Sequence, residues 1–228
     1  MDTLIHCAFK ALRSMLNGKI IFILAISIAI NLLIILGIAS LVIYLIGEVT
    51  WSWLPSFLLG AAPYFIGGMI SFFFFPLLLP LIVSFFSENV ASAIEKEDYP
   101  AVTSIERPFW QEVRLDLLFT LKVIGINLLI LPLYLIPGIN LFIYYLVNGS
   151  LVGAEFFSMA ARRHVPLADV KAIRRKFRGR IFLCGISIVI ATTFPILNFL
   201  SPIWGMALMV HLYQELKKLA AQPELLQG

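Results

Sequence analysis

The chain has 228 residues, of which 61% are hydrophobic and only 13% are charged, and its mean hydropathy is +0.96. A soluble domain carries about twice this share of charge, and one of this size could not bury so much apolar surface in one core. The composition therefore excludes an ordinary soluble protein and predicts an all-α integral membrane protein. The formal net charge of +4 is expected to anchor loops beside the bilayer, so it does not imply a nucleic-acid partner.

A short amphipathic helix is predicted within residues 1–19. Its polar and basic face is formed by residues at helical spacing, namely His6, Lys10, Arg13, Ser14 and Asn17. A helix of this kind is expected to lie in the headgroup region of a membrane.

Two transmembrane helices are expected within residues 20–87. The uncharged run from Ile20 to Ile46 would form a helix of about 40 Å, which is enough to cross a hydrocarbon core of about 30 Å with some tilt. The following segment contains several prolines and glycines, so an unbroken helix through it is not expected. One span from about Pro63 to Ser87 fits best.

Lysine and arginine are unevenly distributed among the polar segments. Three lie before the first span, four in the cytoplasmic or interfacial segment 88–122, and eight in the basic segment 155–180. By the positive-inside rule, the charged segments and both termini are predicted to be cytoplasmic, and only the turn at 47–55 faces outward. A basic helix is predicted from Leu167 to Phe177, after the break at Val165-Pro166.

A pair of similar units, 58 residues apart, is the most unusual feature. Lys122 and Arg180 are each followed by fourteen uncharged residues and then a proline, Pro137 or Pro195. The apolar units 123–154 and 181–216 are each too long for one crossing and too short for two, which need about 40 residues. Each unit is therefore predicted to form a V-shaped, half-penetrating helical hairpin, with arms of about 21–22 Å. Two short full spans per unit remain the alternative.

The hairpin tips combine turn-forming residues with asparagines. Pro137, Gly138 and Pro195 favour turns, and Asn140 and Asn198 can satisfy backbone groups that a turn leaves free. Irregular backbone at membrane depth is tolerated only inside protein or beside water. The tips are therefore expected to meet each other, to meet a partner subunit or to line a cavity. They are structural turns or, as a functional hypothesis, residues that line or gate an anion path.

The other candidate surface is basic, and no catalytic motif accompanies it. The basic cytoplasmic face is predicted either to anchor the chain to anionic headgroups or to attract anions, and it comprises Arg174, Arg175, Lys176, Arg178 and Arg180. The sequence has no nucleophile–base pair, phosphate-binding glycine loop or metal-ligand spacing. We therefore expect no enzyme activity, no metal and no cofactor.

The order of these parts resembles the CysZ sulfate permease family, within the wider etoposide-induced-protein-like superfamily. The resemblance is carried by Phe109-Trp110-Gln111, Leu135-Ile136-Pro137-Gly138-Ile139-Asn140, Val165-Pro166 with the basic helix after it, and Phe194-Pro195-Ile196-Leu197-Asn198-Phe199. It implies a single domain over residues 1–228, with two spanning helices and two half-penetrating helical pairs. It also implies a homo-oligomer in the bacterial inner membrane that passes sulfate for cysteine biosynthesis.

One motif departs from the family pattern. The family usually shows Gly-x-Arg-Arg at the start of the first span, where sulfate is thought to bind, and this chain reads Asn17-Gly18-Lys19-Ile20. The resemblance therefore implies an anion site at Gly18 and Lys19, with Arg13 as the candidate substitute for the missing arginine. Lysine offers a point charge instead of arginine's bidentate fork. The alternative function is a non-transporting membrane scaffold, or a lipid- or partner-binding protein of the same fold.

Overall fold

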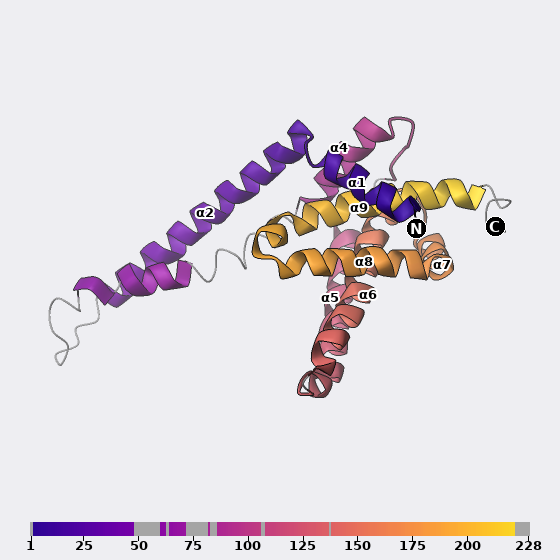
Figure 1. The fold of residues 1–228 in the computed structure, drawn as a ribbon. Coiled ribbons are helices and arrows are strands. Elements are labelled where there is room, and N and C mark those ends of the chain that lie inside the picture. Colours follow the sequence, from indigo (N-terminus) through magenta and orange to yellow (C-terminus); the bar gives the residue numbers. More distant parts are fainter. Residues whose placement is uncertain are drawn as a thin grey trace.

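The computed structural model describes residues 2–47, 60–62, 64–71, 82, 86–105, 108–136 and 138–221. All regular secondary structure in these residues is helical, which confirms the all-α prediction (Figure 1). The expected outward turn at 47–55 lies almost entirely outside the described residues, as do much of the second expected span and Pro137. Residues 60–62 and 64–71 are helical. The helices described over their whole length are α1 (Asp2–Ser14), α2 (Gly18–Gly47), α4 (Ser87–Asp98), α5 (Phe109–Tyr134), α6 (Ile139–Arg162), α7 (Leu167–Lys176), α8 (Arg178–Thr193) and α9 (Pro195–Ala221).

Three described helices are long and apolar enough to cross a membrane. They are α2 over Gly18–Leu45, the later part of α5 over Leu117–Tyr134, and α6 over Ile139–Arg162. None of the last eighteen residues of α5 is fully buried within this chain, as expected for a helix that contacts lipid or another subunit. These helices confirm that the chain is an integral membrane protein.

The arms of the first hairpin are longer than the sequence suggested. Helix α5 has 26 residues and begins at Phe109, and α6 has 24 residues and continues to Arg162, so the arms are about 39 Å and 36 Å long. The expected arm length of about 21–22 Å is therefore wrong for this hairpin. The physical reason is that the helix does not break at Lys122 or at Glu155, so each arm extends beyond the apolar unit into charged sequence.

The second hairpin differs from the first. Its first arm, α8, has 16 residues and is about 24 Å long, which is shorter than the hydrocarbon core. Neither α8 nor α9 meets the length and hydropathy needed for a span among the described helices. Figure 1 shows α8 and α9 side by side, with the α5–α6 hairpin projecting away from them. Half-penetration therefore stays a prediction for the second hairpin, whereas the first has arms that can cross.

The two hairpins are joined by a close contact between α6 and α8. A Cβ atom placed on Gly185 of α8 would overlap the carbonyl oxygen of Gly149 and would lie 2.7 Å from Cα of Gly153. Gly149 and Gly153 form a G-x-x-x-G pattern on one face of α6, which lets helix backbones approach closely. Hydrogen is the only side chain that fits at this crossing.

The core of the molecule surrounds α9. Its segment from Ile203 to Leu216 is mostly buried, and α1, α4, α6 and α8 all pack against it. Figure 1 shows α1 and α4 on one side of α9 and the second hairpin's other arm, α8, beside it. An apolar helix covered from several sides needs no polar face, and α9 therefore serves as the central helix of this layer.

A buried histidine on α9 ties α1 and α4 to this core. His211 Nε2 lies 2.9 Å from Ser14 Oγ, and its Nδ1 lies 2.9 Å from the hydroxyl of Tyr99. Lys10 Nζ donates to the same Tyr99 hydroxyl at 3.2 Å and lies 3.9 Å from Asp98 Oδ1. Both polar atoms of the buried imidazole therefore have partners, as a buried polar group requires.

Substitution of a glycine in α8 is expected to lower stability at the helix crossing and to be harmless away from it. Gly185→Ala should lower the melting temperature of the purified protein, because forcing a methyl group into backbone atoms typically costs about 1–3 kcal/mol. Gly179→Ala is the matched control on the same helix, where a Cβ meets nothing within 4 Å. Its melting temperature should stay the same or rise, since alanine favours helix. Equal melting temperatures for the two variants would contradict the close crossing.

Acid is expected to weaken the fold through His211, which lies outside the three spanning-length helices. Burial, reinforced by the charge of Lys10, lowers the pKa of His211 to about 4, against the opposing effect of Asp98 and Glu215 and with a further lowering by His6. The unfolded chain takes up this proton near pH 6.5. Stability is therefore full above about pH 6.5 and falls as the pH drops towards 4, by a total on the order of 3 kcal/mol.

Thermal melts of the detergent-solubilised protein between about pH 7 and pH 5 measure this effect. The melting temperature of the wild type should fall across the range, and His211→Gln should remove most of the fall. His6→Gln, at an exposed position on α1, removes only a minor cause of the lowered pKa of His211 and should leave most of the fall intact. A slope unchanged in His211→Gln would show that other groups cause it.

Candidate functional site

A pocket of about 400 Å³ lies where α2 begins beside α4. Two lysines line it, Lys19 from α2 and Lys96 from α4, together with the polar side chains of Asn89 and Ser92. Gly18, Phe22, Ile23 and Ala93 complete its wall. No acidic residue is among the described residues that line it. The pocket can therefore offer ammonium, amide and hydroxyl donors to an anion.

The start of α2 is fixed by Asn17. Its Oδ1 accepts a hydrogen bond from the backbone N–H of Lys19 at 2.7 Å, which is the geometry of an N-cap. Its Nδ2 donates to a carboxylate oxygen of Glu97 on α4. One side chain thus caps α2 and holds α4 beside it. The helix N-terminus adds a partial positive charge at the pocket, with backbone N–H groups that have no partner within the helix.

The predicted anion-site residues are only partly brought together. Gly18 and Lys19 line the pocket, whereas Arg13 lies exposed in the last turn of α1 and is not among the lining residues. Lys96 was not predicted to take part. Its helical spacing to Ser92 and Asn89, four and seven residues earlier, places all three on one face of α4 and was readable in the sequence. What the sequence did not show is that this face meets α2.

The position of α4 depends on a buried ion cluster with the C-terminal end of the first hairpin. Arg163 forms a bidentate pair with Glu95, in which Nε donates to Oε1 at 3.1 Å and Nη2 donates to Oε2 at 3.0 Å. His164 Nε2 lies 2.9 Å from Oε1 of the same carboxylate. Burial alone would raise the pKa of Glu95, but the hydrogen bonds from His164 and Arg163 outweigh it and hold the pKa below its usual value. The carboxylate therefore stays ionised at neutral pH.

His164 itself is held on two further sides. Its Nδ1 lies 3.0 Å from the carbonyl oxygen of Thr103, and its ring stacks on Tyr213 of α9 with centroids 5.3 Å apart. The cluster therefore joins α4, the turn after α6, and the central helix. Lys96 is the residue after Glu95, so the ion cluster determines where this lysine lies.

The hairpin tips are local turns that do not meet. Gly138 has φ +84°, a conformation that favours glycine, and begins α6 as its N-cap. Asn140 Oδ1 accepts from the backbone N–H of Leu141, and the backbone N–H of Asn198 donates to Phe194. Figure 1 shows the two turns well apart. At the second tip, Thr193 instead contacts α6, where its Oγ1 lies 3.0 Å from the Tyr145 hydroxyl.

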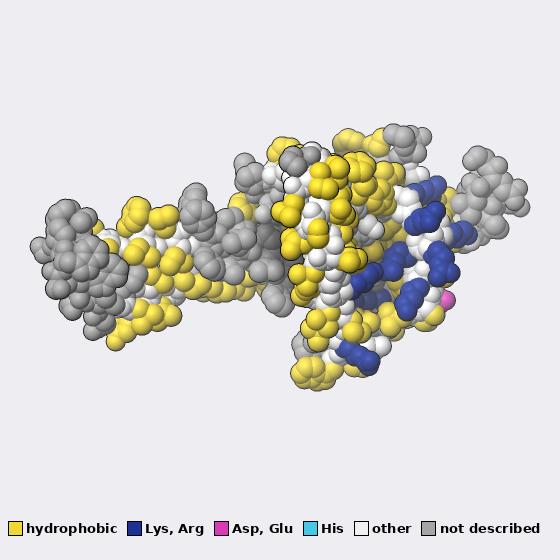
Figure 2. All heavy atoms as spheres, turned by 90° about the horizontal axis from the view of Figure 1, so that it is seen from below, with side chains coloured by type: hydrophobic (Ala, Val, Ile, Leu, Met, Phe, Trp, Pro, Cys, Tyr) yellow, Lys and Arg dark blue, Asp and Glu magenta, His cyan; other side chains and the backbone are white. Residues whose placement is uncertain are grey.

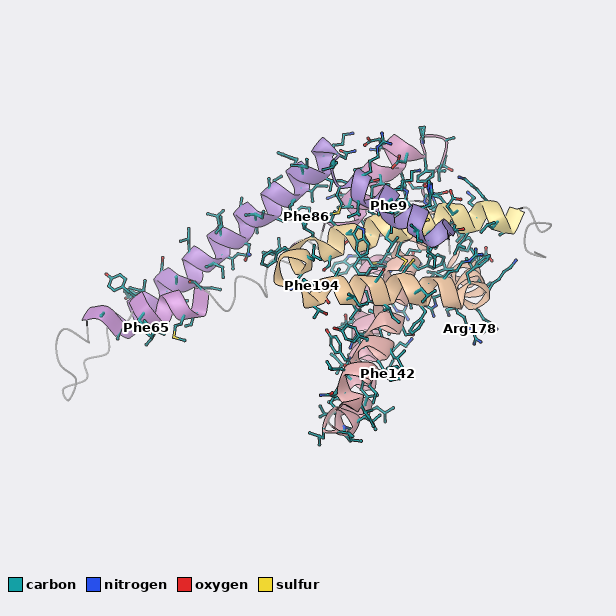
Figure 3. The ribbon with its side chains drawn as sticks, viewed as in Figure 1. Phe9, Phe65, Phe86, Phe142, Arg178 and Phe194 are labelled. Atoms are coloured by element: carbon teal, nitrogen blue, oxygen red, sulfur yellow. The ribbon has the colours of Figure 1, made fainter. Side chains whose placement is uncertain are left out.

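Pro195 begins α9 directly after the turn, as expected of a residue whose fixed φ suits a helix start. Phe194 marks this turn in Figure 3, and Phe142 lies near the other one. The first tip carries exposed apolar side chains, among them Leu135, which is 81% exposed, and Phe142. Within one chain the two tips do not meet each other, and contact with a partner subunit or the lining of a cavity stays a prediction.

The predicted basic face divides into two groups. Arg174, Arg175 and Arg178 line a second pocket, of about 350 Å³, beside the first hairpin. Lys176 and Arg180 lie over the ring of Phe177, at 5.5 and 5.8 Å from its centroid. The basic helix itself, α7, ends at Lys176 and confirms the predicted element.

The family of the chain follows from a match to residues 7–202, which is the greater part of its length. The matching family is described as "Sulfate transporter CysZ/Etoposide-induced protein 2.4", in agreement with the resemblance found in the sequence. A search of curated proteins found no significant match. The family match and the three spanning-length helices together support a general role in membrane transport. The chain belongs to the sulfate transporter CysZ/etoposide-induced protein 2.4 family.

Proposed function

We propose that the protein is a permease or channel for sulfate, or for a similar small inorganic anion, in the bacterial inner membrane. In the cell it would supply sulfur for cysteine biosynthesis. The observation that carries this proposal is the pocket at the start of α2, where Lys19 and Lys96 converge beside a helix N-terminus.

The chemistry of this pocket suits a small oxyanion. Sulfate has only acceptor atoms, and the pocket supplies donors through Lys19, Lys96, Asn89 and Ser92. The positive end of the α2 dipole adds to the attraction. Two lysines bind less tightly than an arginine pair with bidentate geometry. Moderate affinity is compatible with transport, because a transported ion must also leave its site.

The place of the pocket also suits one end of a membrane path. It lies at the first turns of a helix of 30 residues that is long enough to cross the bilayer, and Phe22 and Ile23 form its apolar side. The positive-inside rule places this end, and both chain termini, in the cytoplasm. We expect the path to continue past residues of the hairpin tips, with Pro137, Gly138, Asn140, Pro195 and Asn198 as candidates.

A homo-oligomer is part of the proposal. The first hairpin exposes apolar side chains along its tip and along α5, including Leu128 and Leu129. A second copy of the chain would supply protein neighbours to the irregular backbone around Gly138, as membrane depth requires.

The alternative is a scaffold that binds lipid or a partner without transport. The specific observation in its favour is the basic pocket beside α7, which lies apart from the start of α2. Under this alternative, charge reversal at Arg174 and Arg175 would change localisation or partner capture, and no flux would exist to be lost.

Sulfate uptake into proteoliposomes separates the two functions. Wild-type protein should take up labelled sulfate above the level of empty liposomes. Lys19→Ala and Lys96→Ala should each lower uptake at low sulfate concentration by about tenfold or more, because a lost charged hydrogen bond costs roughly 1.5–3 kcal/mol. Lys19→Arg should preserve it, since the charge and donors remain.

Lys217→Ala is the control, because this exposed lysine on α9 does not line the pocket. Uptake should match the wild type. If folded wild-type protein gives no more uptake than empty liposomes, the transport proposal is wrong. If uptake exists but Lys19→Ala and Lys217→Ala behave alike, the site is not at the start of α2.

A further inference from the structure

A second basic pocket lies where the two hairpins meet α7. It has a volume of about 350 Å³ and is lined by residues from four helices: Lys122 of α5; Ser150, Leu151 and Ala154 of α6; Lys171, Arg174 and Arg175 of α7; and Arg178, Ile181 and Phe182 of α8. Figure 2 shows the lysine and arginine side chains gathered beside the apolar first hairpin. Figure 3 places Arg178 at the end of α8 nearest α7.

Among the residues that the structure describes, no acidic side chain neutralises the charge of this pocket. Five cationic side chains line it, and no acidic side chain is among the described lining residues. Lys122, Lys171, Arg175 and Arg178 form no ion pair with any residue that the structure describes. Gathering like charges from three helices, α5, α7 and α8, costs free energy unless an anion binds between them.

The donors are of the kind that suits a phosphate group. Three of the five cations are arginines, whose planar fork matches phosphate oxygens bidentately. Arg174 is held in place by a hydrogen bond, in which its Nη1 donates to Ser158 Oγ at 3.2 Å. The hydroxyl of Ser150 adds a neutral donor in the lining. A phosphate group can occupy the centre of this set with several charged hydrogen bonds.

The surroundings favour a phosphate that is attached to a lipid. Lys122 lies within the spanning-length part of α5, between Leu121 and Ile124, which are 57% and 50% exposed. Leu183, one residue beyond the lining of α8, is also exposed. A headgroup in the pocket would therefore have apolar helix surface beside it for its acyl chains, whereas a soluble anion would leave this surface uncovered.

We propose that this pocket is a binding site for a phosphate group, supplied by the headgroup of an anionic phospholipid. The phosphate is bound by Arg174, Arg175 and Arg178 and by the two lysines. The acyl chains lie along α5. The site is separate from the pocket at the start of α2, so its occupancy is measured without reference to sulfate transport.

Native mass spectrometry of the full-length protein in detergent tests the site. The probes are phosphatidylglycerol, phosphatidylcholine and inorganic phosphate. Phosphatidylglycerol should bind saturably and more tightly than phosphatidylcholine, and Arg175→Gln should weaken its binding by about tenfold. Arg175→Lys should lose part of the affinity, because a lysine keeps the charge but loses the fork.

Lys176→Gln is the matched control. It removes one positive charge from the adjacent position of the same helix, but Lys176 does not line the pocket. General attraction of a basic surface to anionic lipid would make Arg175→Gln and Lys176→Gln equal, and equality would overturn the proposal. Circular dichroism of both variants checks that each is folded.

The measurements with inorganic phosphate show whether the bound phosphate group belongs to a lipid or to a free anion. If phosphate competes with phosphatidylglycerol only weakly, and both depend on Arg175, the lipid is the ligand. If inorganic phosphate binds in an Arg175-dependent manner and phosphatidylglycerol does not, the site takes a soluble phosphate and the lipid assignment is wrong. If neither inorganic phosphate nor phosphatidylglycerol binds, the proposed phosphate site does not exist.

Discussion

The close contact of α6 and α8 is the constraint on which the rest of the structure depends. Gly149 and Gly153 face Gly185 so closely that the backbones touch, and no larger side chain fits between them. This contact holds the second hairpin against the first (Figure 1). It also brings α7, which precedes α8, beside Lys122 of α5, and so assembles the basic pocket from four helices. In membranes, where apolar surfaces gain little from leaving lipid, such close backbone packing is a main source of helix association.

The same hairpin also positions the pocket at the start of α2. Arg163 and His164, directly after α6, hold Glu95 of α4, and Lys96 is the next residue. Asn17 then joins α4 to the first turn of α2. A movement of the first hairpin relative to the core would therefore pass to α4 and change the distance between Lys19 and Lys96. This chain of contacts gives a physical route from the first hairpin to the pocket at the start of α2, where we propose that an anion binds.

Much of the fold was readable from the sequence, because its signals are local. Helical spacing and long apolar runs predicted α1, α2 and α7, and duplicated prolines predicted the two turns. The expected arm length of the first hairpin was too short because it counted only the apolar unit 123–154, whereas both helices continue into charged sequence. Lys96 and Gly185 were missed for another reason. Their roles depend on contacts with distant segments, and a single sequence does not show which helix faces meet.

An unequal pair of hairpins is the central feature of this architecture, and labelling of the two tips from the periplasm tests it most directly. Single cysteines would replace the exposed Leu135 at the first tip and the exposed Leu197 at the second, since both native cysteines, Cys7 and Cys184, are buried. Because α5 and α6 are long enough to cross and α8 is not, a membrane-impermeant thiol reagent should label position 135 and leave position 197 unlabelled. Labelling of both positions, or of neither, would contradict this arrangement.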